Sequence, residues 1–185
     1  MNQEALRSRL FIELDCVTLD AREIAGKLSV TQLTWRPSDN GWGVGHILEH
    51  LVLSHDSYLT RMRGLIYARN AAHAEDGHAD WEPSLAGWLL VSSLRSKRRM
   101  PSPKPWRVNP EPRAEVLKEF LGRQDQLVTF LRAASALDWT RVRLTSPTAR
   151  FIRLNLGDAF MVLTVHAQRH IKQMERIRDL PDFPS

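Results

Sequence analysis

Residues 156–180 read LGDAFMVLTVHAQRHIKQMERIRDL, and they indicate the fold class. Their apolar side chains recur every three or four positions, which is the spacing of one face of an α-helix. The residues expected to face inward are Phe160, Leu163, Ala167, Ile171, Met174 and Ile177. Pro181 follows the stretch and cannot continue a helix. The stretch therefore predicts an amphipathic helix that buries one apolar stripe in a core.

Three further segments carry the same helical spacing, and no segment of useful length alternates apolar and polar residues as a half-buried strand does. The additional predicted helices span residues 4–28, residues 44–67 and the region from Pro112 to near Ala136. Four amphipathic helices of this length predict an all-α four-helix bundle. At 185 residues, the chain is expected to form a single domain, residues 1–185.

The connection between the second and third predicted helices is unusually long. It covers about residues 70–112, whereas neighbouring antiparallel helices are usually joined by about 2 to 8 residues. We therefore expect a crossover that covers one end of the bundle and contains a short helix over residues 84–94. A second irregular stretch, residues 138–153, leaves room for a short extended segment.

The net charge of +5 comes from one segment of the chain. Residues 95–107 hold six basic side chains and no acidic one, and removing these six from 26 basic residues leaves 20 against 21 acidic. Such a patch is typical of a solvated connection, and it also fits contacts to an anionic ligand, for which Arg98 and Arg99 are candidates. Because no known nucleic-acid-binding motif accompanies the patch, the sequence does not predict nucleic-acid binding.

The charge pattern also bears on where the protein resides. The longest uncharged stretch is residues 83–94, well below the roughly 20 apolar residues of a membrane span. Glu4, Arg7 and Arg9 lie where a secretory signal would need an apolar core. Cys16 is the only cysteine, which excludes an internal disulfide and a cysteine-only metal site. We expect a cytoplasmic protein without a membrane span.

Two pairs of histidines lie four residues apart, His46 with His50 and His166 with His170. Residues i and i+4 of a helix project from the same face and can reach one ion. At about 100° per residue, His50, His166 and His170 fall at the rim of the buried helix faces, His46 falls further out, and His55 points inward as a core histidine. Three imidazoles from two helices would bind a divalent ion and leave positions open for water or substrate.

The motifs that surround these histidines are WRP at residues 35–37, GWGVGHILEHL at 41–51 and HAQRHIKQ at 166–173. They resemble the DinB superfamily, also described as DinB-like or YfiT-like metal-dependent hydrolases. The resemblance implies a four-helix bundle with a long crossover, a homodimer, and a divalent ion such as nickel, zinc or iron. It implies His50, His166 and His170 as the metal ligands.

The chain departs from the family pattern at two positions. Gly43 stands where the family commonly has a serine at the start of the second helix, so the helix cap is uncertain. His46 matches no ligand of the family. It is a candidate to support His50 or to compete as a ligand, although an exposed histidine without such a role is the favoured interpretation.

Three functions stay open at the level of sequence. A divalent ion can supply hydroxide by lowering the pKa of a bound water, which predicts hydrolysis of a small-molecule substrate. The resemblance also implies an alternative, an S-transferase or isomerase that acts with a low-molecular-weight thiol held as thiolate. The third hypothesis is a non-enzymatic bundle that binds nucleic acid or a partner protein, with the histidines incidental.

The remaining polar and aromatic candidates have structural interpretations. No residue is identified as a general acid or base, because Glu49 is expected to point away from His50 and Asp158 to cap the last helix after Asn155. His73 and His78 lie in the acidic part of the crossover and are expected to be solvated. A further expectation concerns the tryptophans that could line a pocket beneath the crossover, namely Trp81, Trp88 and Trp106.

Overall fold

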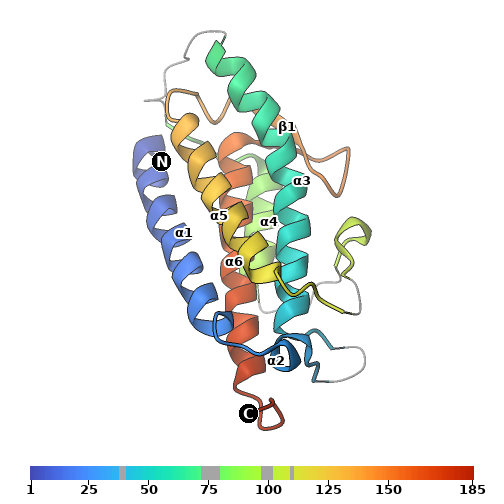
Figure 1. Cartoon of the computed structure of the whole chain (residues 1–185). Coiled ribbons are helices and arrows are strands. Elements are labelled where there is room, and N and C mark those ends of the chain that lie inside the picture. Colours follow the sequence, from blue (N-terminus) through green and yellow to red (C-terminus); the bar gives the residue numbers. More distant parts are fainter. Residues whose placement is uncertain (38–40, 72–79, 97–101, 109–110) are drawn as a thin grey trace.

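Four long helices form the bundle predicted from the sequence (Figure 1). The structure is a computed structural model that describes residues 1–37, 41–71, 80–96, 102–108 and 111–185. The bundle helices are α1 (Gln3–Ala25), α3 (Val44–Ala71), α5 (Val116–Ala133) and α6 (Leu156–Arg178). The all-α class is therefore confirmed, and each predicted helix is present with ends shifted by a few residues.

The order of the helices explains the long crossover. Contacts close a ring in which α3 packs on α5, α5 on α1, α1 on α6 and α6 on α3. In Figure 1, α3 and α5 run in the same direction, opposite to α1 and α6. Two parallel helices that follow each other in the chain need a connection that returns along the bundle. This connection carries α4 (Leu85–Arg95) and the one-turn 3-10 helix η1 (Lys104–Trp106).

Helix α4 confirms the short helix expected at residues 84–94, but its position corrects the expectation that the crossover covers one end of the bundle. Its Ser84 cap accepts a hydrogen bond from the Gly87 N–H at 3.0 Å. The helix packs along the side of α6, and its Val91 joins the bundle core. The apolar face of α4 needs a second apolar surface to bury it, and the flank of α6 provides one.

The smaller elements lie in the other connections. Helix α2 (Val30–Thr34), which the sequence analysis did not predict, begins with a capping box between Ser29 and Gln32. The extended segment expected within residues 138–153 is present as β1 (Arg143–Thr145), which pairs antiparallel with β2 (Arg153–Asn155). None of the helices in the described ranges is long and apolar enough to cross a membrane.

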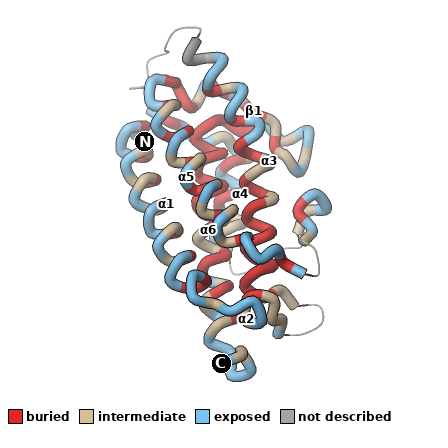
Figure 2. The backbone as a smooth tube through the Cα atoms, viewed as in Figure 1, coloured by how far each residue is buried: buried red, intermediate tan, exposed pale blue. Residues whose placement is uncertain are grey.

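The buried core is divided by a polar layer. Figure 2 shows buried residues along the inner faces of the bundle helices. They form two apolar clusters, and on α6 the first cluster ends at Val165 while the second begins at Ala167. On α3 the change falls between Val52 and Tyr58. The buried polar side chains between the two clusters are Ser54, His55, Gln124 and His166.

A close contact between α4 and the start of α6 gives the first prediction. Asp158 caps α6 as expected, accepting from the Asn155 N–H at 2.9 Å, and it also accepts from the Ser84 hydroxyl at 2.6 Å. A Cβ added at Gly87 would lie 2.1 Å from the Asp158 carboxylate. We expect Gly87→Ala to lower the free energy of unfolding, measured in urea, by about 1 to 3 kcal/mol.

Gly64→Ala is the matched control, because Gly64 is also within a helix but a Cβ added there meets no atom within 4 Å. It should raise the free energy of unfolding by up to about 1 kcal/mol, the helix propensity gained by replacing glycine. If the two substitutions had the same effect, the packing of α4 against the start of α6 would be wrong.

Candidate metal centre

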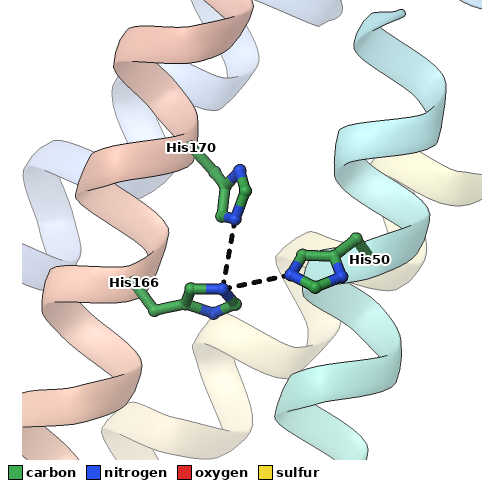
Figure 3. Close-up of side chains that lie close together, drawn as sticks. All are labelled: His50, His166 and His170. Atoms are coloured by element: carbon green, nitrogen blue, oxygen red, sulfur yellow. Dashed lines mark hydrogen bonds between the residues drawn. The ribbon is translucent and has the colours of Figure 1, made fainter. Parts of the chain in front are cut away.

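Three histidines from two helices converge at one point of the bundle (Figure 3). His50 comes from α3, and His166 and His170 lie one turn apart on α6. The Nε2 atom of His166 is 3.1 Å from the Nε2 of His50 and 3.1 Å from the Nε2 of His170. One nitrogen from each ring lies within 4.8 Å of the others. Nitrogen ligands about 2.0–2.1 Å from a shared ion have this separation.

These imidazoles are more buried than the sequence analysis expected. The helical wheel places them at the rim of the core, but His50, His166 and His170 are only 3%, 7% and 8% exposed. The difference arises from the crossover, because the indole of Trp106 packs 5.9 Å from the ring of His50 and 6.1 Å from that of His166. A wheel describes one helix and contains no information about a segment that covers it.

The outer nitrogens of two histidines face oxygen acceptors. The Nδ1 of His50 is 3.2 Å from the carbonyl oxygen of Trp106. The Nδ1 of His170 is 3.0 Å from the Oε1 of Gln173. A carbonyl oxygen only accepts hydrogen bonds, so each of these rings carries its proton on Nδ1 when it is neutral. The Nε2 lone pair is then left free to bind a metal.

The third histidine follows the same pattern through a hydroxyl group. The Nδ1 of His166 is 3.4 Å from the Oγ of Ser54. Because the Ser54 hydroxyl donates its own hydrogen to the Leu51 carbonyl at 3.0 Å, its oxygen is oriented to accept from His166. All three Nε2 atoms therefore present lone pairs to one another, an arrangement that a cation between them would stabilise.

Burial keeps the three imidazoles neutral. It lowers the pKa of His50, although the hydrogen bond to the Trp106 carbonyl opposes the shift. Burial and the charge that His50 would carry lower the pKa of His170 to about 3. Burial, reinforced by His170 and His50, holds the pKa of His166 well below its usual range. Neutral imidazole is the form that binds divalent metals, so the site needs no deprotonation at neutral pH.

Two indoles enclose the three histidines. Trp42 lies with its ring 4.9 Å from that of His50 and stacks at 6.3 Å on His170. Trp106 packs against His50 and His166 and donates its Nε1–H to the Ser57 hydroxyl at 3.1 Å. These aromatic contacts limit the access of water to the point where the nitrogens converge.

Only one of the three tryptophans expected beneath the crossover lines this site. Trp106 does, whereas Trp81 is buried elsewhere and donates its Nε1–H to the Asn155 Oδ1 at 3.0 Å. Trp88 is 56% exposed on the outer face of α4. The expectation is wrong for Trp81, which precedes α4 and packs against the start of α6, and for Trp88, which α4 turns toward solvent.

His46 also differs from its favoured interpretation. It is 2% exposed, and its Nδ1 accepts a hydrogen bond from the Gly43 N–H at 3.3 Å. This bond satisfies a backbone donor at the start of α3, the task of a capping side chain. A Cβ at Gly43 would lie 1.8 Å from the carbonyl oxygen of Trp35, so no side chain fits there. The cap is therefore supplied by His46, which does not belong to the metal-binding cluster.

Two other expectations near the site are confirmed. Glu49 points away from the cluster and forms an ion pair with Arg113 at 2.7 Å. Burial raises the pKa of Glu49, but hydrogen bonds from Arg113 outweigh it and leave the pKa below its usual value. His55 is a core histidine that is fully buried, with its Nδ1–H donated to the Leu51 carbonyl at 2.8 Å. Neither residue belongs to the cluster of three histidines.

The candidate residues of the crossover lie outside the described residues. They are Arg98 and Arg99 in the basic segment and His73 and His78 in the acidic segment.

A cleft of about 1090 Å³ opens from the three histidines. Its walls come from α3, α4, α6 and residues 102–108 of the crossover. The sequence analysis did not identify three residues that shape the centre, Trp42, Ser54 and Gln173. Ser54 lies four positions after His50, and Gln173 lies three positions after His170. Residues at these spacings share one face of a helix, so the sequence could have indicated that both lie near the histidines.

The fold and the centre together define a helical bundle whose interior could hold a divalent ion beside an open cleft. The sequence model of the DinB superfamily matches residues 17–174, and the chain belongs to this superfamily. The resemblance found in the motifs is thereby confirmed. Comparisons with curated proteins and with solved structures find no match.

Proposed function

We propose that this protein is a metal-dependent hydrolase in which His50, His166 and His170 bind one divalent ion. A single observation carries the proposal: three buried Nε2 atoms converge while each Nδ1 faces an oxygen acceptor. Three imidazoles suit nickel, zinc or iron, and three protein ligands leave positions open for a substrate atom, as in catalytic sites.

The chemistry depends on both the ion and its surroundings. When bound, a divalent ion here would lower the pKa of a coordinated water to about 7, or equally hold a thiol as its thiolate. Because the three imidazoles are neutral, they would leave the positive charge of the ion uncompensated. Trp42 and Trp106 limit solvent, and the cleft supplies room for a small-molecule substrate. Within the described ranges no carboxylate lines the cleft, so we assign no general base.

The charge of the cleft favours a second candidate function, S-transfer or isomerisation with a low-molecular-weight thiol. The charged side chains that line the cleft are Arg107, Arg169 and Arg176. Such thiols commonly carry carboxylates, which these guanidinium groups would attract. The homodimer implied by the resemblance stays a prediction.

An assay with and without thiol separates the two functions. Untagged protein is stripped with a chelator, reloaded with nickel, zinc or iron, and offered 4-nitrophenyl esters and anilides, or 1-chloro-2,4-dinitrobenzene with a panel of thiols. We expect ester or anilide turnover that needs metal, needs no thiol and is lost in His166→Ala but retained in His46→Gln. Conjugation that requires thiol would replace the hydrolase proposal with the transferase, and inactivity of every loaded form would contradict both.

A further inference from the structure

The cleft beside the histidines has a one-sided charge. Its charged lining consists of Arg107 from the crossover with Arg169 and Arg176 from α6. The chain carries 21 acidic residues, yet none in the described part of the chain lines the cleft. A low-dielectric concavity lined by charge of one sign focuses its field and concentrates counter-ions of the opposite sign.

The two outer arginines are available to a ligand. Arg107 and Arg176 are both exposed, and no described carboxylate forms an ion pair with either of them. In contrast, Arg113 and Arg123 pair with Glu49 and Asp56 across helices. Arg107 and Arg176 can therefore offer their planar donor groups to a carboxylate, phosphate or sulfonate without breaking an ion pair to a described carboxylate.

The third arginine holds the wall of the cleft in place. Arg169 lies between the two histidines of α6 in sequence, and its guanidinium group donates to the carbonyl of Leu94 at 2.9 Å and to that of Ser96. These carbonyls are at the C-terminal end of α4, where a cation is favourable. Arg169 therefore ties the crossover to α6, while its positive charge lowers the pKa of both His166 and His170.

The lining also has an apolar part. It includes Leu90 and Leu94 of α4 and Val162 and Leu163 of α6. An apolar surface of this kind binds hydrocarbon or aromatic groups, while a few polar groups fix the orientation of the ligand. A small inorganic anion would leave it uncovered.

We propose that the cleft binds an organic anion, with its carboxylate, phosphate or sulfonate held by Arg107 and Arg176 and its apolar body against α4 and α6. The proposal names the class of substrate that the metal centre would take. It rests on the proposed function in one respect, namely which end of the ligand reacts. The anionic end would then lie at the arginines, and the remainder of the molecule would extend toward the three histidines.

A matched pair of fluorescent probes tests this assignment without turnover. 8-Anilinonaphthalene-1-sulfonate carries a sulfonate, and N-phenyl-1-naphthylamine has the same ring system without it. Both are titrated at physiological salt into chelator-treated protein, into the double variant Arg107→Gln/Arg176→Gln, and into Arg22→Gln, an exposed arginine of α1 outside the cleft. Circular dichroism verifies that each variant is folded.

We expect the double variant to bind the sulfonate probe about tenfold more weakly than wild type, the scale of losing charge-assisted hydrogen bonds. Binding of the neutral probe should be unchanged in every form, and Arg22→Gln should behave as wild type. Equal affinity of wild type and the double variant for the sulfonate probe would overturn the proposal. Because the protein is metal-free, this outcome is independent of whether the histidines bind metal or support hydrolysis.

Discussion

His166→Ala is expected to weaken the binding of a divalent ion by roughly 100- to 1000-fold, since each ligand of a structural zinc site contributes a few kcal/mol. His166 is the central histidine of the cluster, because its Nε2 lies 3.1 Å from the Nε2 atoms of both His50 and His170. Removing it leaves two imidazoles on different helices. Competition with a chromophoric chelator measures the affinity, and elemental analysis of untagged protein measures the stoichiometry, which should be close to one ion per chain.

Two variants make this test specific. His46→Gln removes the histidine that forms an i, i+4 pair with His50, and its amide oxygen can keep the bond to the Gly43 N–H. We expect its metal affinity to stay near that of wild type. Ser54→Ala removes the acceptor of His166 Nδ1 and should weaken binding about 10- to 100-fold, the usual effect of a group that orients a ligand. If His166→Ala retained wild-type affinity, or if His46→Gln lost it equally, the three-histidine assignment would be wrong.

The parts of the fold that follow from local pattern could be predicted. The stripe on α6 gives both its length and its buried face, because a helix of more than five turns repeats its apolar spacing often enough to exclude a strand. Asn155 and Asp158 mark its start through a capping box, which is also a local signal. These features require no knowledge of the partner helices.

The parts that depend on contacts between distant segments could not be predicted from periodicity. The wheel assigns His46 to solvent because it treats α3 alone, whereas the backbone carbonyls of Leu33 and Trp35 lie against the start of that helix. Likewise, no local pattern indicates that Trp42 and Trp106 approach the same histidine, His50, from different connections. The three ligands were selected by their match to family motifs, and the structure then brings those residues together.

The polar layer across the core could be predicted from the sequence only in part. His55 interrupts an apolar stripe, and the sequence alone identifies it as an inward-facing histidine. Its partner is not evident from sequence, because Gln124 lies on α5, where its amide nitrogen approaches the His55 Nε2 at 3.0 Å. A buried pair of this kind is therefore half predictable, and its energetic consequence can be derived only from the structure.

We expect acid to destabilise the metal-free protein through His55. Burial lowers its pKa to about 4, whereas an unfolded histidine has a pKa of about 6.5. Between these values the unfolded chain takes up a proton that the folded chain does not, so the free energy of unfolding falls as the pH decreases from about 6.5 to about 4. The shift of about 2.5 units corresponds to a loss of about 3 kcal/mol, and the contribution is constant above about pH 7.

Urea unfolding between pH 8 and pH 4.5 measures this dependence in wild type, His55→Gln and Gly64→Ala. The histidines of the metal centre add a loss of the same sign in all three proteins, because burial also lowers their pKa values. His55→Gln should show a shallower decrease, by about 2.5 kcal/mol over this range. At Gly64 an added Cβ meets no atom within 4 Å, so Gly64→Ala changes stability without disturbing a titratable group, and its decrease should match that of wild type. An unchanged decrease in His55→Gln would mean that His55 is protonated in the folded protein or accessible to solvent, contrary to its buried position between Leu51 and Gln124.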